Sequence, residues 1–173
     1  GFHPLWCLEA QRKGMVIQME GQKTIRQMEE ALLQVLPWWN YRLAKPFKEL
    51  LDEGVSLEMY YCIQILRWVG KPITMSELAE AAHMPKQQMT KMVNRLVEPG
   101  LVERVYDPAD RRVIRIRLTE KALSYTDQFL DQNAGYFRRF LEEIGEEDRE
   151  DFMKALEILL RILPHLPHTE TEP

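Results

Sequence analysis

In residues 113–118, VIRIRL, the apolar residues Ile114, Ile116 and Leu118 alternate with two arginines, which is the period of a β-strand and not of a helix. Residues 101–106, LVERVY, form a second candidate strand directly before it. The six residues between the two are mostly charged and include a proline. The pattern predicts a β-hairpin. Because apolar residues elsewhere recur at helical spacing, the fold has to place one small hairpin within a helical protein.

Apolar spacing and helix-stop residues predict the other elements. The expected helices span about residues 20–36, 39–51, 57–69, 76–82, 85–98, 119–144 and 147–163. Pro37 is expected to end or kink the first helix, and Pro46 to start or bend the second. Thr74 and Glu77 have the spacing of a capping box, and Pro85 suits the first position of the fifth helix.

Two short helices joined by a tight turn and followed by a basic hairpin make a winged helix-turn-helix. The sequence therefore predicts a mainly α fold, a winged helix-turn-helix with a two-stranded β-wing and flanking dimerisation helices. The flanking helices are too long and too apolar to stand alone, so they are expected to pair with a second copy of the chain.

The expected organisation has five parts. They are an N-terminal extension at residues 1–19, N-terminal dimerisation helices at 20–55, the winged helix-turn-helix at 56–118, C-terminal dimerisation helices at 119–163 and a flexible tail at 164–173. Residues 1–14 are expected to be either native or an addition upstream of a natural start at Met15 or Met19.

Composition excludes several classes of protein. No segment approaches the roughly 18 consecutive apolar residues of a membrane span, and the first residues lack the basic and apolar regions of a secretory signal. The two cysteines, Cys7 and Cys62, are too few for a disulfide framework and fit a cytoplasmic protein. A single disulfide between them is the alternative.

Charge is spread unevenly along the chain. The net charge is −4, but residues 86–117 hold eight basic and four acidic side chains, a net +4, whereas residues 118–173 hold six basic and 13 acidic ones, a net −7. A basic middle inside an acidic chain is typical of a local polyanion site. Chance clustering on a solvated surface is the alternative.

The helix expected at residues 85–98 has one polar face without an acidic residue in its first three turns. This face carries Lys86, Gln87, Gln88, Thr90 and Lys91. A helix fits the major groove of B-DNA, where glutamine can pair with adenine, lysine with guanine or a phosphate, and threonine with a thymine methyl. We expect DNA contact, with a merely solvated helix face as the alternative.

The hairpin tip combines acids with arginines. Arg112 is placed to enter the minor groove, and Asp110 can orient its guanidinium through a bidentate pair or cap the turn. Arg111 stands beside them. Arg115 and Arg117 lie on the strand face opposite Ile114 and Ile116, where they either reach phosphates or stay in solvent.

Residues 57–120 resemble the MarR family of winged-helix transcriptional regulators. The motifs that carry the resemblance are SELA at residues 76–79, RLVEPGLVER at 95–104, DPADRR at 107–112 and LTEKA at 118–122. The resemblance implies a homodimer that binds a pseudo-palindromic operator in double-stranded DNA, usually as a repressor released by a small ligand, an oxidant or a metal. It adds Arg95 and Arg104 as residues that support the wing or touch the DNA backbone. Pro99 departs from the family pattern, in which a polar residue is usual.

The resemblance gives less information about the signal. An effector pocket for a small aromatic compound is expected near Trp38, Trp39, Tyr41, Tyr60, Tyr61 and Trp68, with packing in the core as the alternative. Cys7 is the candidate for a redox-sensing thiol, and Cys62 reads as a core residue. The four histidines are scattered, so no metal site and no cofactor are expected.

No catalytic constellation is visible in the sequence, so an enzyme is not expected. The predicted function is a cytoplasmic, sequence-specific DNA-binding regulator of the MarR type, a homodimeric repressor released by a small molecule. Two alternatives remain: a thiol-redox-sensing regulator of the same fold, and a winged-helix module that binds proteins and not DNA.

Overall fold

A computed structural model of the chain describes residues 24–166. The chain divides into two compact units, the first ending at Leu50 and the second beginning at Leu51. No helix within residues 24–166 combines the length and apolar character needed to cross a bilayer.

Within its described residues, from 24 onward, the first unit is one uninterrupted helical stretch. It comprises α2 (Ile25–Trp39), the π-helical turn η1 (Asn40–Ala44) and α3 (Lys45–Leu50). Thr24 caps its start through a reciprocal box, in which Thr24 Oγ1 accepts from the Gln27 N–H at 3.3 Å and Gln27 Oε1 accepts from the Thr24 N–H at 2.9 Å.

The expected separation of this stretch into two helices, 20–36 and 39–51, is wrong. Pro37 lies inside α2, and the chain stays helical past it. Proline has no backbone N–H, so Pro46 cannot donate the hydrogen bond that a regular α-helix makes to the carbonyl four residues earlier. In a π-helical turn each carbonyl accepts instead from the N–H of the fifth residue further along the chain. The π-helical turn that precedes Pro46 therefore accommodates a proline that would disrupt a regular α-helix.

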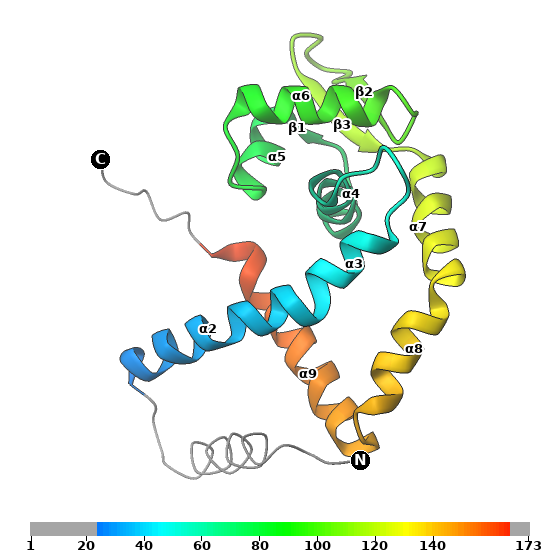
Figure 1. Ribbon diagram of the computed structural model, residues 1–173. Helices are drawn as coiled ribbons and strands as arrows, with labels where there is room; N and C mark the ends of the chain where they lie inside the picture. The colour runs from blue at the N-terminus through cyan, green and yellow to red at the C-terminus, as the bar shows by residue number, and fades with distance from the viewer. Residues whose placement is uncertain (1–23, 167–173) are drawn as a thin grey trace. The chain divides into compact units, whose positions relative to one another are not determined.

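The second unit contains the winged helix-turn-helix (Figure 1). Its elements are α4 (Leu57–Val69), β1 (Ile73–Thr74), α5 (Met75–Ala81), α6 (Lys86–Val97), β2 (Val102–Tyr106) and β3 (Ile114–Leu118). The three strands form an antiparallel sheet in the order β1-β3-β2. The mainly α fold with a winged helix-turn-helix is confirmed. The sheet has one strand more than expected, because β1 is two residues long and too short to show an alternating pattern.

One apolar core holds this unit together. Ile63 of α4, Leu78 of α5, Met89 and Leu96 of α6 and Ile116 of β3 are fully buried in it. Burying side chains of this size contributes about 1.5–3 kcal/mol each before the entropy of ordering is counted. The core therefore fixes the orientation of α6, since rotating the helix would expose Met89 and Leu96.

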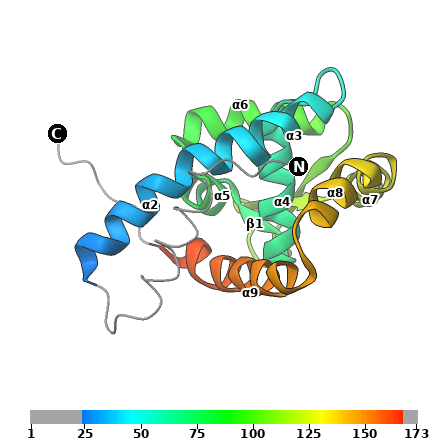
Figure 2. The same cartoon turned by 60° about the horizontal axis from the view of Figure 1, so that its bottom comes forward.

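Three helices and a short turn follow the sheet. They are α7 (Glu120–Gln132), α8 (Ala134–Glu143), α9 (Glu146–Ile162) and the 3₁₀ turn η2 (Leu163–His165). The expected single helix over 119–144 is wrong, because it breaks at Asn133 (φ −106°, ψ 14°). The Asn133 side-chain amide donates to the Phe129 carbonyl at 2.9 Å. An asparagine side chain that bonds the backbone in this way competes with the helical ladder. Figure 2 shows α7 and α8 in succession and α9 running back toward α5.

Polar contacts fasten α7 to the rest of the second unit. Arg67 Nη1 of α4 donates to Thr126 Oγ1 at 2.6 Å, and Thr126 Oγ1 donates to the Leu123 carbonyl at 2.9 Å. Lys121 Nζ donates to the Pro99 carbonyl at 2.6 Å, just beyond the end of α6. Thr126 is only 1% exposed, so its hydroxyl depends on these partners for hydrogen bonding.

Replacing Thr126 with valine is expected to lower the free energy of unfolding by about 1–2 kcal/mol, because it removes the buried acceptor of Arg67. Asp127→Asn is the matched control. Asp127 contacts Arg67 at 3.4 Å on the exposed side of the same guanidinium, so its neutralisation is expected to cost less than about 0.5 kcal/mol. Urea unfolding followed by circular dichroism measures both. A control that costs as much as Thr126→Val would contradict the larger contribution assigned to the buried contact.

Candidate nucleic-acid interface

The turn between α5 and α6 presents the start of α6 at the surface. Thr74 caps α5 by accepting from the Glu77 N–H at 3.2 Å. The chain then reverses at His83, whose φ of 49° lies in the left-handed region. The N–H of Met84 returns to the Ala79 carbonyl at 2.9 Å, which closes the turn. Proline at 85 follows, and α6 begins directly after it.

The polar face of α6 points away from the core. All five residues predicted to read DNA are exposed: Lys86, Gln87, Gln88, Thr90 and Lys91. Met89 and Val93, on the other side of the helix, are fully buried. Pro85 at the N-cap supplies no side-chain hydrogen bond to the first backbone N–H groups of this 12-residue helix. This end of α6 is therefore suited to an anion such as a phosphate.

The wing tip holds Arg112 in a defined position. Its Nε and Nη2 donate to the two carboxylate oxygens of Asp110 at 3.1 and 3.2 Å, and its backbone N–H donates to Oδ1 at 3.0 Å. The side chain remains 92% exposed. The Arg112 side chain and then its backbone N–H hold the pKa of Asp110 below its ordinary value. Asp110 therefore both ends the turn and orients the guanidinium toward solvent.

Arg115 and Arg117 are engaged within the wing. Arg115 pairs with Asp107 at 3.3 Å and lies 3.8 Å from Glu77 at the start of α5. Arg117 pairs with Glu103, its directly opposed neighbour on β2. The N–H of Ala109, followed by Arg115, holds the pKa of Asp107 below its ordinary value. Both arginines thus cross-link the hairpin, whereas the exposed Arg112 is directed outward.

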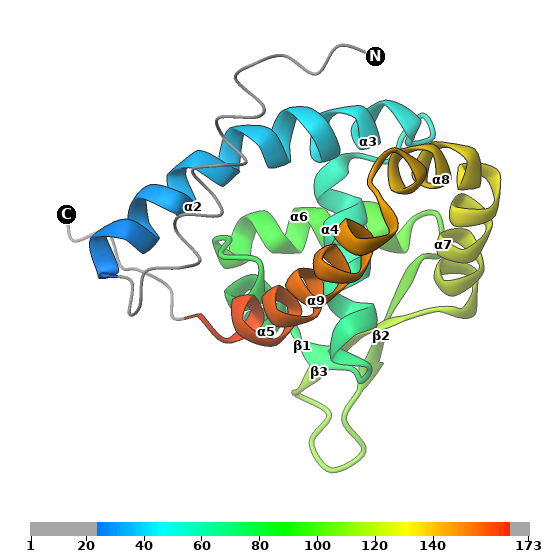
Figure 3. The ribbon, with the colours of Figure 1, turned by 90° about the horizontal axis from the view of Figure 1, so that it is seen from below.

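Helix α6 and the wing line a basic hollow of about 390 Å³. Its cations are Lys86, Arg104 and Arg112, with Thr90 and Ile114 also at its surface. Arg104 Nη2 of β2 donates to Asn94 Oδ1 of α6 at 2.5 Å, which ties the wing to the helix. Figures 1 and 3 show the loop of the hairpin extending beyond the rest of the unit.

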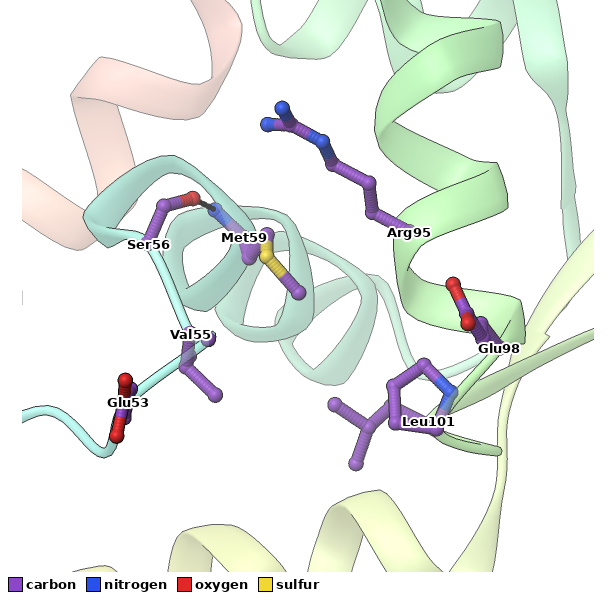
Figure 4. Close-up of a pocket in the computed structure, with 9 residues that line it drawn as sticks. Glu53, Val55, Ser56, Met59, Arg95, Glu98 and Leu101 are labelled. Carbon is purple, nitrogen blue, oxygen red and sulfur yellow. Dashed lines mark hydrogen bonds between the residues drawn. The ribbon is translucent and has the colours of Figure 1, made fainter.

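Arg95 belongs to another cavity, of about 780 Å³, that lies between the start of α4 and the end of α6. Figure 4 shows its side chain extending from α6 into this space. The carboxylates of Glu53 and Glu98 and the side chain of Met59 also line the cavity. Arg95 therefore does not join the hollow beside the wing that contains Arg112.

The aromatic residues expected around an effector pocket are divided between the two units. Trp38, Trp39 and Tyr41 are exposed on the first unit, where Arg42 lies over the Trp38 ring and Lys45 over the Tyr41 ring. Tyr60 is buried, contacts Phe129 with ring centroids 5.5 Å apart, and accepts from Gln64 at 3.0 Å. Tyr60 is thus a core residue, as the alternative interpretation held.

Trp68 is exposed on α4 and lines a third cavity, of about 610 Å³. Arg67, Ala81 of α5 and Leu160 of α9 also line it. Trp68 further contacts the His165 ring edge-on, with centroids 5.9 Å apart. This cavity connects the helix-turn-helix with α9, and its lining is mostly apolar.

The candidate thiols differ in what the structure describes. Cys7 lies outside the described residues. Cys62 is buried, and burial, followed by the negative charge of Glu58, raises the pKa of its thiol to about 11. The thiolate is the reactive form, so Cys62 is a poor nucleophile at neutral pH. Within residues 24–166 no group of three His, Cys, Asp or Glu side chains could hold a metal ion.

Two residues that position α6 were not predicted. Lys121 fixes the segment after α6 from a position 22 residues further along the chain, and Asn94 accepts from Arg104 across the helix–wing junction. A basic residue after a helix and an asparagine on its polar face are common on solvated surfaces. Only the tertiary contact distinguishes them, so no local pattern could have identified either residue.

Comparison with known proteins gives a consistent family. The MarR family profile matches residues 62–113, from α4 to the wing tip. A Bacillus subtilis protein described as the uncharacterized HTH-type transcriptional regulator YsmB is 31% identical over 110 residues, which cover 63% of this chain and 75% of that protein. The organic hydroperoxide resistance transcriptional regulator of the same organism is 26% identical and is matched over 84% of this chain and 97% of its own length.

Solved structures share the fold. A MarR family protein from Bacillus stearothermophilus superposes with a TM-score of 0.65 at 22% identity, covering 82% of this chain and 99% of that one. The winged helix-turn-helix described above, the family match within it and the relative covered over three quarters of its length lead to one conclusion. The chain belongs to the MarR family and is a DNA-binding transcriptional regulator.

Proposed function

We propose that the chain is a homodimeric repressor that reads a pseudo-palindromic DNA site and is released by a small-molecule effector. The observation that carries the DNA-binding mode is the basic hollow that Lys86 and Thr90 of α6 share with the outward Arg112, on a helix whose Gln/Lys face is exposed. In this proposal α6 enters the major groove through Gln87, Gln88, Thr90 and Lys91. Lys86 and the N-terminus of α6 bind phosphate.

Arg112 enters the adjacent minor groove, where the potential is negative. Because the bidentate pair with Asp110 already restricts the Arg112 side chain, Arg112 loses less conformational freedom when it binds DNA. Arg111, exposed beside it, is proposed to contact the phosphate backbone. Arg95 is assigned a supporting role through the cavity that it lines at the end of α6.

Exposed apolar side chains support the proposed dimer. None of the residues of α2 is buried, and its exposed apolar members are Ile25, Met28, Leu32, Leu33, Val35 and Leu36. Helix α9 likewise has no buried residue and exposes Met153, Leu160 and Ile162. Apolar surfaces of this extent usually mark a protein interface. We therefore retain residues 20–55 and 119–163 as dimerisation regions around the DNA-binding region 56–118.

Two cavities are candidates for the effector. The one beside Trp68 is mostly apolar and bridges α4, α5 and α9, so an aromatic compound bound there would act on the helix-turn-helix. The one beside Arg95 is bounded by charged groups and touches α6 itself. We propose the first as the site of a small aromatic effector, because only that cavity includes one of the exposed aromatic residues.

A second candidate function is release by an oxidant. It is favoured by the likeness to a relative named for organic hydroperoxide resistance. Cys7 would then be the sensing residue, since the Cys62 thiol is buried and its pKa is raised. Either function requires access to the chromosome, so we place the protein in the cytoplasm, and we propose no catalytic activity and no cofactor.

Substituting Gln87 and Lys91 together with alanine is expected to abolish preference for the operator while weak, salt-dependent binding persists. Arg112→Ala is expected to weaken binding by about 1–3 kcal/mol. Fluorescence anisotropy on a duplex recovered by selection from a random pool measures both. If the double variant and the wild-type protein bind all duplexes equally weakly, the winged helix is an interaction module and does not read DNA.

Asp110→Asn is expected to weaken operator binding, because Arg112 loses its ionised partner. In the wild-type protein the lowered pKa keeps Asp110 charged above the ordinary carboxyl value of about 3.9. The stabilising pair is present above that value and is lost as the pH falls through the lower, folded-state pKa. Binding measured between pH 5.5 and 8 should therefore show no Asp110-dependent transition. Equal affinity of the wild-type protein and Asp110→Asn would contradict this role.

In a Cys7→Ser variant, iodoacetamide at pH 7 should label Cys62 about a hundredfold more slowly in the folded than in the urea-unfolded protein, because the folded thiol is almost entirely protonated. Treatment of the wild-type protein with an organic hydroperoxide should leave DNA bound. Release that a thiol reductant reverses, and that Cys7→Ser abolishes, would establish the second candidate function in place of the first.

A further inference from the structure

The wing exposes an apolar pair near its tip. Tyr106 ends β2, Ile114 begins β3, and the strand register places them directly opposite each other. Tyr106 is 67% exposed and Ile114 39%. Ile114 continues the apolar alternation of this strand, but it is not part of the core. The core contact is made by Ile116, two residues further on, which is fully buried.

This pair lies on the sheet face that is turned toward α6. Directly opposed residues share a face, and so do residues two apart along a strand. Tyr106 and Ile114 therefore share a face with the next pair, Arg104 and Ile116. Arg104 donates to Asn94 of α6, and Ile116 is in the core, so this face is turned toward α6. Tyr106 and Ile114 extend it by one pair toward the wing tip.

Cations lie beside the Ile114 end of this apolar pair. Ile114 lines the same hollow as Lys86, Arg104 and Arg112. A surface with cations around an apolar centre matches the chemistry of a DNA groove wall, in which phosphates alternate with deoxyribose rings. Proteins that enter the minor groove commonly place apolar side chains beside their arginines.

We propose that Tyr106 and Ile114 pack against the deoxyribose rings of the minor groove that receives Arg112. The inference rests on the proposed DNA-binding mode and adds a non-ionic contact to it. The pair limits how deeply the wing enters and holds the Arg112 guanidinium at the level of the base edges. Tyr106 is thereby a positioning residue for Arg112.

The test compares affinity and its salt dependence for the full-length protein on a duplex recovered by selection from a random pool. Tyr106→Ala is expected to weaken binding about tenfold, the loss expected when one side chain of this size is no longer covered. The slope of log affinity against log salt should stay unchanged, because no phosphate contact is removed. Arg112→Ala, in contrast, should make the slope shallower by about one.

Two further variants separate this role from a structural one. Tyr106→Phe retains the ring and should bind within about twofold of the wild-type protein. Val105→Ala is the control, since it shortens a side chain of the same strand on the opposite face, and it should also bind within about twofold. Thermal unfolding of each variant verifies that the hairpin is retained.

Hydroxyl-radical footprinting locates the contact, because the radical attacks deoxyribose from the minor groove. Tyr106→Ala should lose protection at the wing positions and keep it at the positions covered by α6. Unchanged affinity of Tyr106→Ala, an equal loss in Val105→Ala, or a shallower salt slope would overturn the inference while leaving the proposed function intact. Failure of the wild-type protein to select any DNA sequence would overturn both.

Discussion

The rest of the structure depends on the burial of one stripe of α6. Met89, Val93 and Leu96 are fully buried among α4, α5 and the sheet, and this burial sets the rotation of the helix. The same rotation leaves Gln87, Lys91 and their neighbours in solvent. In the proposed binding mode, the reading of DNA by α6 is therefore a consequence of core packing. The apolar face of the helix positions the exposed side chains proposed to contact DNA.

The wing obeys a different constraint, since it projects beyond the core and has little apolar area to bury. Its strands are joined by ion pairs, Arg117 with Glu103 and Arg115 with Asp107, and its tip by Asp110 with Arg112. Exposed pairs of this kind contribute little stability individually. What they supply is orientation: three of the four arginines between 111 and 117 have a carboxylate partner within the wing or in α5, and the exposed Arg112 is held in a single direction.

Prediction from the sequence succeeded where the signal was local. The capping residue Thr74, the apolar stripe of α6 and the short-range pair of Asp110 with Arg112 all follow from residues within four positions of one another. It failed where the outcome depends on tertiary contacts or on weak breakers. Asn133 breaks a helix without proline or glycine at that position, and Ile114 continues an apolar alternation although the core ends before it.

The central claim is that α6 and the wing of two copies of this chain read one symmetric DNA site. Selection of bound duplexes from a random pool by the full-length protein tests it most directly. The account predicts enrichment of a two-fold symmetric motif, with half-sites separated by about 10–10.5 base pairs or a multiple of that distance. A pool that retains no common sequence, with binding that only weakens as salt rises, would contradict it.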